Sequence, residues 1–308
     1  RGLGGGGRSG MAVIVALGIG AVLSGAGPAE PSRSDFAILS WAMLVLCPVM
    51  LALLWIGDVI RPDSPARHRG RDVAGSPWFI WWAGALVVIF GLGVGGALGA
   101  VLMGLGREEE SGTRAVAAQL IGGTVAAAVG VWVLALLGVS PRLGLSLVPR
   151  HRDVAKGLLG LAVVLPIVTA VSFAAAFGFQ VMTGREPPLL AHDALEYMVA
   201  NPRTWRTVML IVLAVVLAPL TEEIVFRGLV QSGFLRVTGR VWPSVLASSA
   251  LFAAVHVGSI GESVHALAPL FVLGVCFGIA YERTGRLWVP IVMHAAFNAW
   301  NTGLALML

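Results

Sequence analysis

Two adjacent carboxylates and an arginine lie within a long apolar run in the C-terminal half of the sequence. Glu222, Glu223 and Arg227 occur in "LTEEIVFRG", which directly follows "RTVMLIVLAVVLAP". An ionisable side chain at mid-bilayer costs at least about 2.5 kcal/mol on insertion scales, so such residues are functional candidates. Glu223 and Arg227 are spaced to form an ion pair along one face of a helix. Glu222 is rotated by about 100° from Glu223, which leaves Glu222 available for chemistry.

Two further apolar stretches carry isolated polar side chains at helical spacing. "SALFAAVHVG" places Phe252 and His256 one turn apart, and "VPIVMHAAFNAWN" places His294 and Asn298 one turn apart. At 1.5 Å per residue, Glu222, both histidines and the amide lie at depths of about 12–22 Å from the predicted cytoplasmic helix ends. We therefore expect them to meet in one cavity within the bilayer. A carboxylate with an imidazole can deprotonate water, and an imidazole with an amide can donate hydrogen bonds to an oxyanion.

The composition predicts that these stretches are membrane-spanning helices. Of the 308 residues, 57% are hydrophobic and 12% are charged, and the mean hydropathy is +0.87. A soluble domain carries about 25% charged residues. We therefore expect an all-α, polytopic transmembrane helical bundle of about nine spans. The predicted spans are residues 11–27, 36–60, 78–106, 115–139, 157–181, 206–231, 242–260, 265–281 and 287–306.

The first predicted span, residues 11–27, has an alternative interpretation. The stretch "MAVIVALGIGAVLSGAG" is short and glycine-rich, which is also typical of a cleaved signal peptide. The bundle would then contain eight spans. The next loop lies outside in both cases, so the orientation of the remaining spans is the same.

The arginine and lysine residues predict the orientation of the bundle. With the N-terminus inside, fourteen of the 21 Arg and Lys residues fall in cytoplasmic segments, six fall outside, and the last is Arg227. This bias favours a cytoplasmic N-terminus. The basic stretch 61–72 is interpreted as a topology-setting loop, and Glu282 with Arg283 as an interface anchor at a span end. Because the arginines are spread over many short loops, the net charge of +5 does not indicate nucleic-acid binding.

Three sequence motifs lie in order on three of the predicted spans. "EEIVFR" fits E-E-x-x-x-R, "FAAVH" fits F-x-x-x-H, and "HAAFN" fits H-x-x-x-N. In this order they resemble the CPBP (Abi) family of intramembrane proteases, which includes the type II CAAX prenyl endopeptidases and bacteriocin-processing proteins. The resemblance covers about residues 155–306. It divides the chain into an N-terminal region of four spans with basic cytoplasmic loops, 1–154, and a CPBP-like protease domain, 155–308.

The resemblance implies an intramembrane endopeptidase of the glutamate type. It implies that Glu222 and His256 activate a water molecule, and that His294 and Asn298 stabilise the oxyanion. The other motif positions are expected to support the site: Glu223, Arg227 and Phe252. The expected partners are membrane lipid and a peptide or membrane-protein substrate, prenylated in the case of the family's prenyl endopeptidases. The expected location is a bacterial cytoplasmic membrane.

The sequence leaves open a dependence on zinc and two other functions. The family has also been described as metalloprotease, and Glu222, His256 and His294 are the residues that could bind zinc, although H-E-x-x-H is absent. Glutamate catalysis without a cofactor is the preferred interpretation. A proton-coupled transporter also buries Glu and His, but it would normally show a two-fold repeat, and here the polar cluster is confined to the C-terminal half. A catalytically silent immunity or scaffold protein on the same fold is the third alternative.

The predicted orientation can be tested by cysteine labelling from the two sides of the membrane. Single cysteines placed near Arg67 should be protected from an impermeant reagent in intact cells, and cysteines near Glu109 should react, because the arginine bias places the basic loop 61–72 inside. The reverse pattern would contradict this topology.

Overall fold

The structure is a computed structural model that describes residues 33–64, 70–104, 112–138, 143–146, 148–185, 187, 193–258 and 263–307, without the side chains of 33–40 and 193. The described part of the chain is helical and contains no strand. Residues 11–27, the first predicted span, lie outside the described residues.

The remaining eight predicted spans each correspond to a helical segment. The segments are α2 (Arg33–Ile56), α4 (Trp78–Leu102), α5 (Thr113–Leu136), α6 (His151–Thr183), the continuous rod α8–α10 (Trp205–Thr238), α11 (Val241–Val255), α12 (Leu267–Thr284) with the short η3 (Val264–Ala266) before it, and α13 (Trp288–Ala305). A short helix, α7 (Asp193–Ala200), precedes the rod. The predicted all-α bundle is therefore confirmed for the described residues.

Five of the described helices are long and apolar enough to cross a membrane: α4, α5, α6, the rod Trp205–Thr238, and Val264–Thr284. Shorter apolar stretches occur at Trp41–Ile56 and Val241–Val255. Helix α13 falls outside this set because His294, Asn298 and Asn301 lower its hydropathy. The chain is thus an integral membrane protein with several spans.

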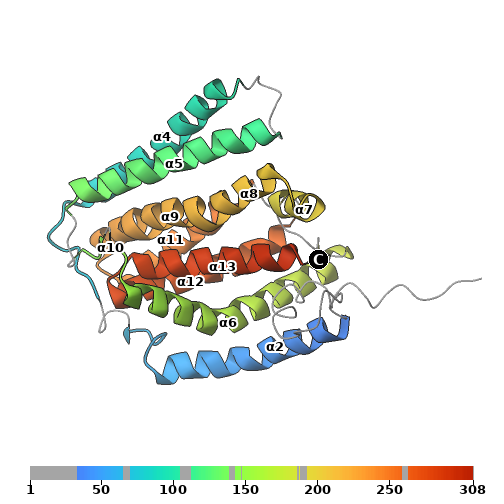
Figure 1. Cartoon of the computed structure of the whole chain (residues 1–308). Helices are drawn as coiled ribbons and strands as arrows, with labels where there is room; N and C mark the ends of the chain where they lie inside the picture. Colours follow the sequence, from blue (N-terminus) through green and yellow to red (C-terminus); the bar gives the residue numbers. More distant parts are fainter. Residues whose placement is uncertain are drawn as a thin grey trace, which may run out of the picture.

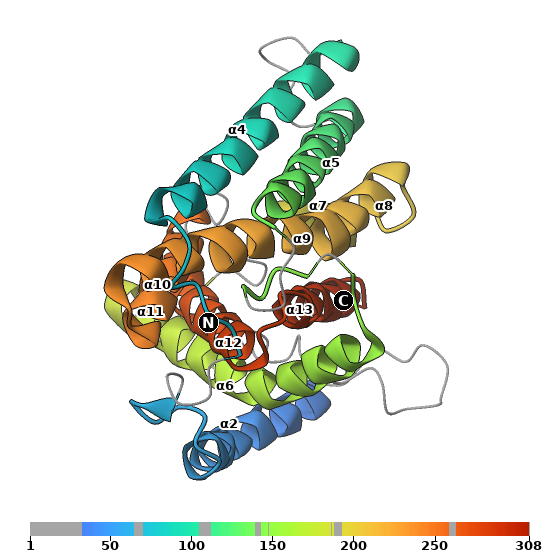
Figure 2. The same cartoon turned by 90° about the vertical axis from the view of Figure 1, so that its left-hand side faces the viewer.

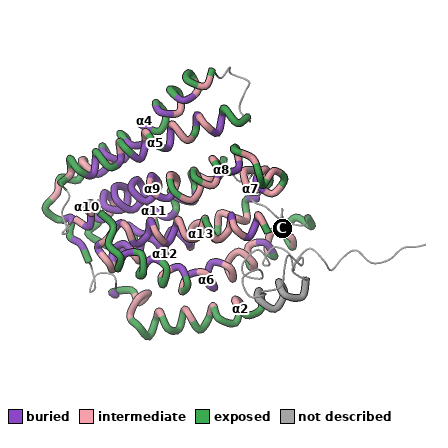
Figure 3. The backbone as a smooth tube through the Cα atoms, in the orientation of Figure 1, coloured by how far each residue is buried: buried purple, intermediate pink, exposed green. Residues whose placement is uncertain are grey.

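The helices form layers, with the rod and α11–α13 in the middle (Figure 1). Helices α4 and α5 lie side by side on one face of this centre, and α6 followed by α2 covers the opposite face (Figures 1 and 2). Buried residues concentrate in the central helices, whereas α2 and the outer sides of α4 and α5 are largely exposed (Figure 3). Such exposed apolar faces are what a bilayer would cover.

The predicted division at residues 154 and 155 remains a prediction, but the main core crosses it. Trp81 of α4 and Val133 of α5 belong to the same buried cluster as Leu229 of the rod. The first half of the chain therefore packs directly against the helix that carries the two adjacent carboxylates.

One expectation from the sequence is wrong. Glu282 is not an interface anchor, because its residue exposure is 0% and it forms an ion pair with Arg71, which is 3% exposed. Arg71 belongs to the loop interpreted as topology-setting, so this loop also has a packing role. A buried charge requires a partner, and no pattern in the sequence indicates that this partner lies more than 200 residues away.

Glycines allow α4 and α5 to approach closely. A Cβ atom added at Gly99 would lie 2.6 Å from the carbonyl oxygen of Ala118, and one added at Gly95 would lie 2.7 Å from Cβ of Val125. Small residues are enriched where membrane helices pack at short distance, because they let the backbones meet.

This contact predicts a difference between two glycines of the same helix. Gly99→Ala should destabilise the protein by about 1–3 kcal/mol, because the new methyl group overlaps the backbone of α5. Gly93→Ala is the matched control, since a Cβ at Gly93 meets no atom within 4 Å. Thermal unfolding in detergent should separate the two variants, and equal midpoints would contradict the packing.

Candidate active site

The rod changes helical register on both sides of the two carboxylates. It runs through α8 (Trp205–Val212), the π-helical η1 (Leu213–Leu217), α9 (Ala218–Glu223), the π-helical η2 (Ile224–Gln231) and α10 (Ser232–Thr238). Glu222 and Glu223 are therefore the last two residues of a short α-helical segment, α9, which lies between two π-helical segments. Such π-helical segments occur frequently at functional sites.

Pro219 explains why one backbone carbonyl of η1 is available to a side chain. The N–H of Ala218 donates to the carbonyl of Leu213, five residues earlier. Continuing this register would pair the carbonyl of Ala214 with residue 219, but proline has no N–H. The carbonyl of Ala214 accepts instead from Nδ2 of Asn298 at 2.8 Å. This bond fixes α13 against the rod.

Glu222 lies between two histidines that come from different helices. Its Oε2 is 3.9 Å from Nε2 of His256, at the C-terminal end of α11, and 3.9 Å from Nε2 of His294, on α13. The side chains of Glu222 and His256 are 26% and 22% exposed, whereas that of His294 is 5% exposed. The cluster is thus open on the side of Glu222 and His256 and closed behind His294.

Glu223 faces away from this opening and holds the inner histidine. Its Oε1 accepts from Nη1 of Arg227 at 3.0 Å, as the sequence spacing predicts, and it also contacts Nδ1 of His294 at 2.9 Å. All three side chains are buried. The second contact was not predicted, because nothing in the sequence shows which carboxylate the histidine of α13 meets.

The buried arginine lies between aromatic rings. Its guanidinium carbon is 4.4 Å from the ring centroid of Phe252 and 5.3 Å from that of Phe277. Nη2 of Arg227 donates to the carbonyl of Gly274 at 3.2 Å. Phe252 is fully buried and also contacts the rings of His256 and His294, at 4.9 and 5.8 Å between centroids. Phe252 thus packs the site, as its motif position implies.

The hydrogen bonds of the two histidines define how their rings face Glu222. Nδ1 of His256 is 2.7 Å from the carbonyl of Phe252, which can only accept, so Nδ1 carries the proton. Nδ1 of His294 similarly donates to the carboxylate of Glu223. In both rings the other nitrogen, Nε2, is the one that faces Glu222. A partner on Nδ1 fixes the orientation and the tautomer of an imidazole.

The structure brings together three of the four predicted catalytic residues. Glu222, His256 and His294 converge, and Asn298 lies one turn beyond His294, where it binds the backbone of η1. Phe277 is an additional site residue that sequence reasoning missed: its ring stacks on His294 with 5.0 Å between centroids and 28° between planes. A lone phenylalanine in an apolar span gives no signal of such a role.

The residue types of the cluster suit zinc, but their arrangement does not form a metal site. A carboxylate and two imidazoles are a familiar zinc donor set. In such sites the ring nitrogen that does not bind the metal is bonded to a carbonyl or a carboxylate, as Nδ1 is in both histidines here. In the described part of the chain, however, no group of three or more His, Cys, Asp or Glu side chains is placed to hold a metal ion. The buried Oε2 of Glu222 makes no hydrogen bond to the protein. We therefore derive the chemistry from the protein's own groups.

The segment that carries the cluster matches a known protein family. Residues 204–300 match the family of type II CAAX prenyl endopeptidases described as Rce1-like. The matched segment contains all three motifs and therefore every residue of the cluster. The resemblance stated from the motifs is confirmed for this segment, and the rest of the chain lies outside the match.

Two curated relatives share part of the chain. An "Uncharacterized 24.3 kDa protein" of Escherichia coli is 38% identical over 80 residues, which are 26% of this chain and 36% of the relative. A protein of Bacillus subtilis (strain 168) named "Putative membrane peptidase YdiL" is 28% identical over 92 residues, which are 30% and 35% of the two chains. The chain thus spans about a third of the length of these relatives. No solved structure matches it.

The buried ion pair predicts a large effect of removing its cation. Arg227→Ala should destabilise the protein by about 3–5 kcal/mol, because Glu223 would remain buried without its positive partner. Thermal unfolding in detergent measures the change. Arg152→Ala, at an exposed position in the first turn of α6, is the control and should have little effect. A wild-type melting temperature for Arg227→Ala would show that the pair does not support the fold.

Proposed function

We propose that the protein is an intramembrane endopeptidase that hydrolyses a peptide bond with an activated water molecule. The observation that carries this proposal is the position of Glu222 between the Nε2 atoms of His256 and His294, with Glu222 on a rod that is long and apolar enough to cross the membrane. The match of residues 204–300 to prenyl endopeptidases supports the same reaction class.

In the proposed reaction, Glu222 and His256 act together as the general base. They take a proton from water, and the hydroxyl oxygen forms a bond to the carbonyl carbon of the substrate. The carbonyl oxygen becomes an oxyanion in a tetrahedral intermediate. The C–N bond then breaks, and the proton held by the Glu222–His256 pair passes to the leaving nitrogen. The products are a carboxylic acid and an amine, so the reaction consumes one water molecule.

The second histidine is suited to stabilise the oxyanion. Nδ1 of His294 donates to Glu223, and in the proposed reaction the ring is doubly protonated when the oxyanion forms. In this form Nε2 also carries a proton and can donate to the developing oxygen anion. Arg227 on the other side of Glu223 forms an ion pair with the same carboxylate within the apolar surroundings. Glu223 and Arg227 are thus positioning residues in this proposal.

Asn298 supplies a second donor in the same proposal. Its amide has two N–H groups, and the carbonyl of Ala214 accepts one hydrogen bond from the amide nitrogen. We assign the other N–H to the oxyanion. The bond to η1 then has a function of its own, because it holds the amide in place before the substrate arrives and reduces the reorganisation needed in the transition state.

The proposed substrate is a peptide or membrane protein, and membrane lipid surrounds the site. Glu222 and His256 form the accessible side of the cluster, so the substrate would enter from that side. A prenylated substrate is proposed from the family description alone.

Replacement of Glu222 tests the function directly. Glu222→Gln keeps the size of the side chain and removes the base, so turnover of a membrane-protein substrate in detergent or proteoliposomes should fall by at least about a hundredfold. Glu196→Gln, at an exposed position of α7, is the matched control and should keep its activity. Near-normal turnover by a folded Glu222→Gln protein would refute the assignment.

The same preparations separate the proposed mechanism from a zinc-dependent one. Chelators should leave the wild-type turnover unchanged, and metal analysis should find no stoichiometric zinc in the wild type. Zinc that is present in the wild type and lost in His294→Ala would instead identify His294 as a metal ligand, because removing a ligand empties a metal site.

A further inference from the structure

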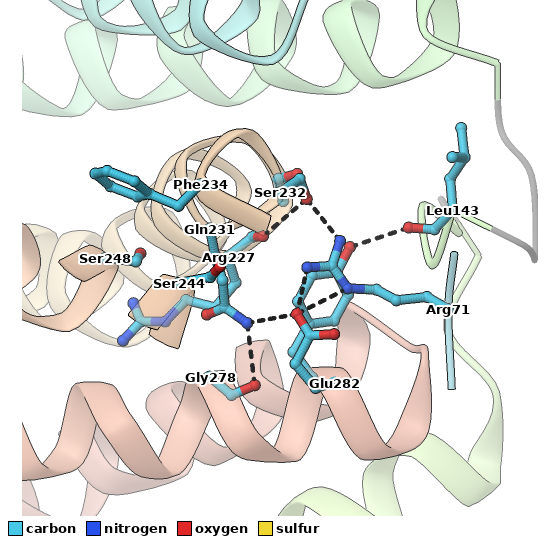
Figure 4. A network of polar contacts seen from close by, with 12 residues as sticks. Arg71, Leu143, Arg227, Gln231, Ser232, Phe234, Ser244, Ser248, Gly278 and Glu282 are labelled. Atoms are coloured by element: carbon cyan, nitrogen blue, oxygen red, sulfur yellow. Dashed lines mark hydrogen bonds and ion pairs between the residues drawn. The ribbon is translucent and has the colours of Figure 1, made fainter. Parts of the chain in front are cut away.

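A second buried polar cluster lies near the end of the rod, away from the candidate active site. Its centre is the ion pair between Arg71, in the loop before α4, and Glu282, in the last turn of α12 (Figure 4). Nε of Arg71 donates to Oε1 of Glu282 at 3.1 Å, and Nη1 donates to Oγ of Ser232 at 2.6 Å. The guanidinium carbon also lies 4.1 Å from the ring centroid of Tyr281. The cluster therefore joins the N-terminal half of the chain to both the rod and α12.

The same carboxylate continues into a row of hydrogen bonds between the rod and α12. Nε2 of Gln231 donates to Oε1 of Glu282 at 2.8 Å and contacts the carbonyl of Gly278 at 3.2 Å (Figure 4). One turn back, Arg227 donates to the carbonyl of Gly274. Donors four residues apart on the rod thus meet acceptors four residues apart on α12. We call this row the seam.

The seam ends at the candidate active site. Arg227 is its last donor, and Arg227 also binds Glu223, which in turn holds His294. Glycines at the acceptor positions make the close approach possible: a Cβ at Gly278 would lie 2.7 Å from Oε1 of Gln231. Because the rod and α12 meet with little clearance, the seam sets the rotation and the height of the rod relative to α12.

The loop that carries Arg71 is fixed tightly to the end of α12. The N–H of Gly70 donates to the carbonyl of Glu282 at 2.6 Å. A Cβ at Gly70 would lie 2.4 Å from the backbone nitrogen of Gly285, so the two backbones are in direct contact. Burial disfavours the charge of Arg71, but the Glu282 carboxylate outweighs this effect, and the pKa of Arg71 lies above its ordinary value. Arg71 therefore stays charged and neutralises Glu282.

We propose that Arg71 is a positioning residue for the candidate active site, although it lies outside the segment that resembles prenyl endopeptidases. It neutralises Glu282, Glu282 holds Gln231, and the seam orients the part of the rod that carries Glu222 and Glu223. Without Arg71, the carboxylate of Glu282 would stay buried next to the seam without its cation. Arg227, at the other end of the seam, is another buried cation in the described part of the chain. Competition for Arg227 would weaken its hold on Glu223. For its effect on turnover, this inference rests on the proposed function.

The test removes both charges of the pair together. Arg71→Met alone leaves a buried carboxylate and should lower the melting temperature strongly, whereas Arg71→Met with Glu282→Met replaces a buried ion pair by apolar groups and should recover stability. If the seam positions the site, the stable double variant should still show a kcat lowered by about tenfold to a hundredfold, with KM within about twofold, since small displacements reduce catalysis by such factors. A double variant with wild-type kcat would overturn the proposal.

Arg283→Met is the matched control. Arg283 is the neighbour of Glu282 and binds the carbonyl of Asp58 at 2.8 Å and Oγ of Ser64 at 3.0 Å, so it ties the preceding loop to the same helix end without entering the seam. Its loss should lower stability while kcat stays at the wild-type value. An equal fall in kcat for Arg283→Met would show that general loosening of this end is responsible, and would overturn the role of Arg71.

Amide hydrogen exchange provides a readout that does not depend on peptidase activity. In the double variant, exchange should rise in peptides that cover residues 217–231, and in Arg283→Met it should not. Unchanged exchange in this segment of the double variant would overturn the positioning role. If exchange rises there but the wild type cleaves no substrate, the proposed function fails while the positioning role stands.

Discussion

Arg227 is buried together with Glu223, and this ion pair restricts how the helices around the candidate site can pack. An isolated charge in an apolar interior is unstable, and breaking a buried pair costs about 3–5 kcal/mol. The guanidinium is therefore surrounded by partners: the carboxylate of Glu223, the carbonyl of Gly274 and two aromatic rings. Glu223 belongs to the rod, Phe252 to α11, and Gly274 and Phe277 to α12. Satisfying one cation thus fixes how three helices meet, and places His294 of α13 against the same carboxylate.

The adjacent carboxylates have different environments because of helical geometry. Glu223 points inward and is fully buried, whereas the side chain of Glu222 is 26% exposed and faces two imidazole rings. Glu223 stabilises the packing of the helices, whereas Glu222 is accessible and can accept a proton. The π-helical segment before the carboxylates contributes to this arrangement, since Pro219 leaves the carbonyl of Ala214 free to accept a hydrogen bond from Asn298. The backbone irregularity of the rod is thereby part of the candidate site.

The N-terminal half of the chain takes part in positioning the site rather than only anchoring it. Helices α4 and α5 pack against the rod, and the core that includes Trp81 and Val133 reaches Leu229. The ion pair of Arg71 and Glu282 extends the polar seam that begins at Arg227. The match to prenyl endopeptidases covers only residues 204–300. Trp81, Val133 and Arg71 therefore connect the matched segment to a part of the chain that lies outside the match.

The features that depend on local spacing along the chain could be predicted from the sequence alone. Hydropathy predicted the membrane helices, and the i, i+4 spacing predicted the pair of Glu223 and Arg227, because neighbours on one helix are set by its pitch. The contacts between side chains of different helices, in contrast, could be identified only from the folded arrangement. The contacts of His294 with Glu223, of Asn298 with Ala214 and of Arg71 with Glu282 join residues 71, 84 and 211 positions apart. The rotation and height of packed helices follow from how their side chains and glycines interlock, and no pattern within one helix specifies the partner on another.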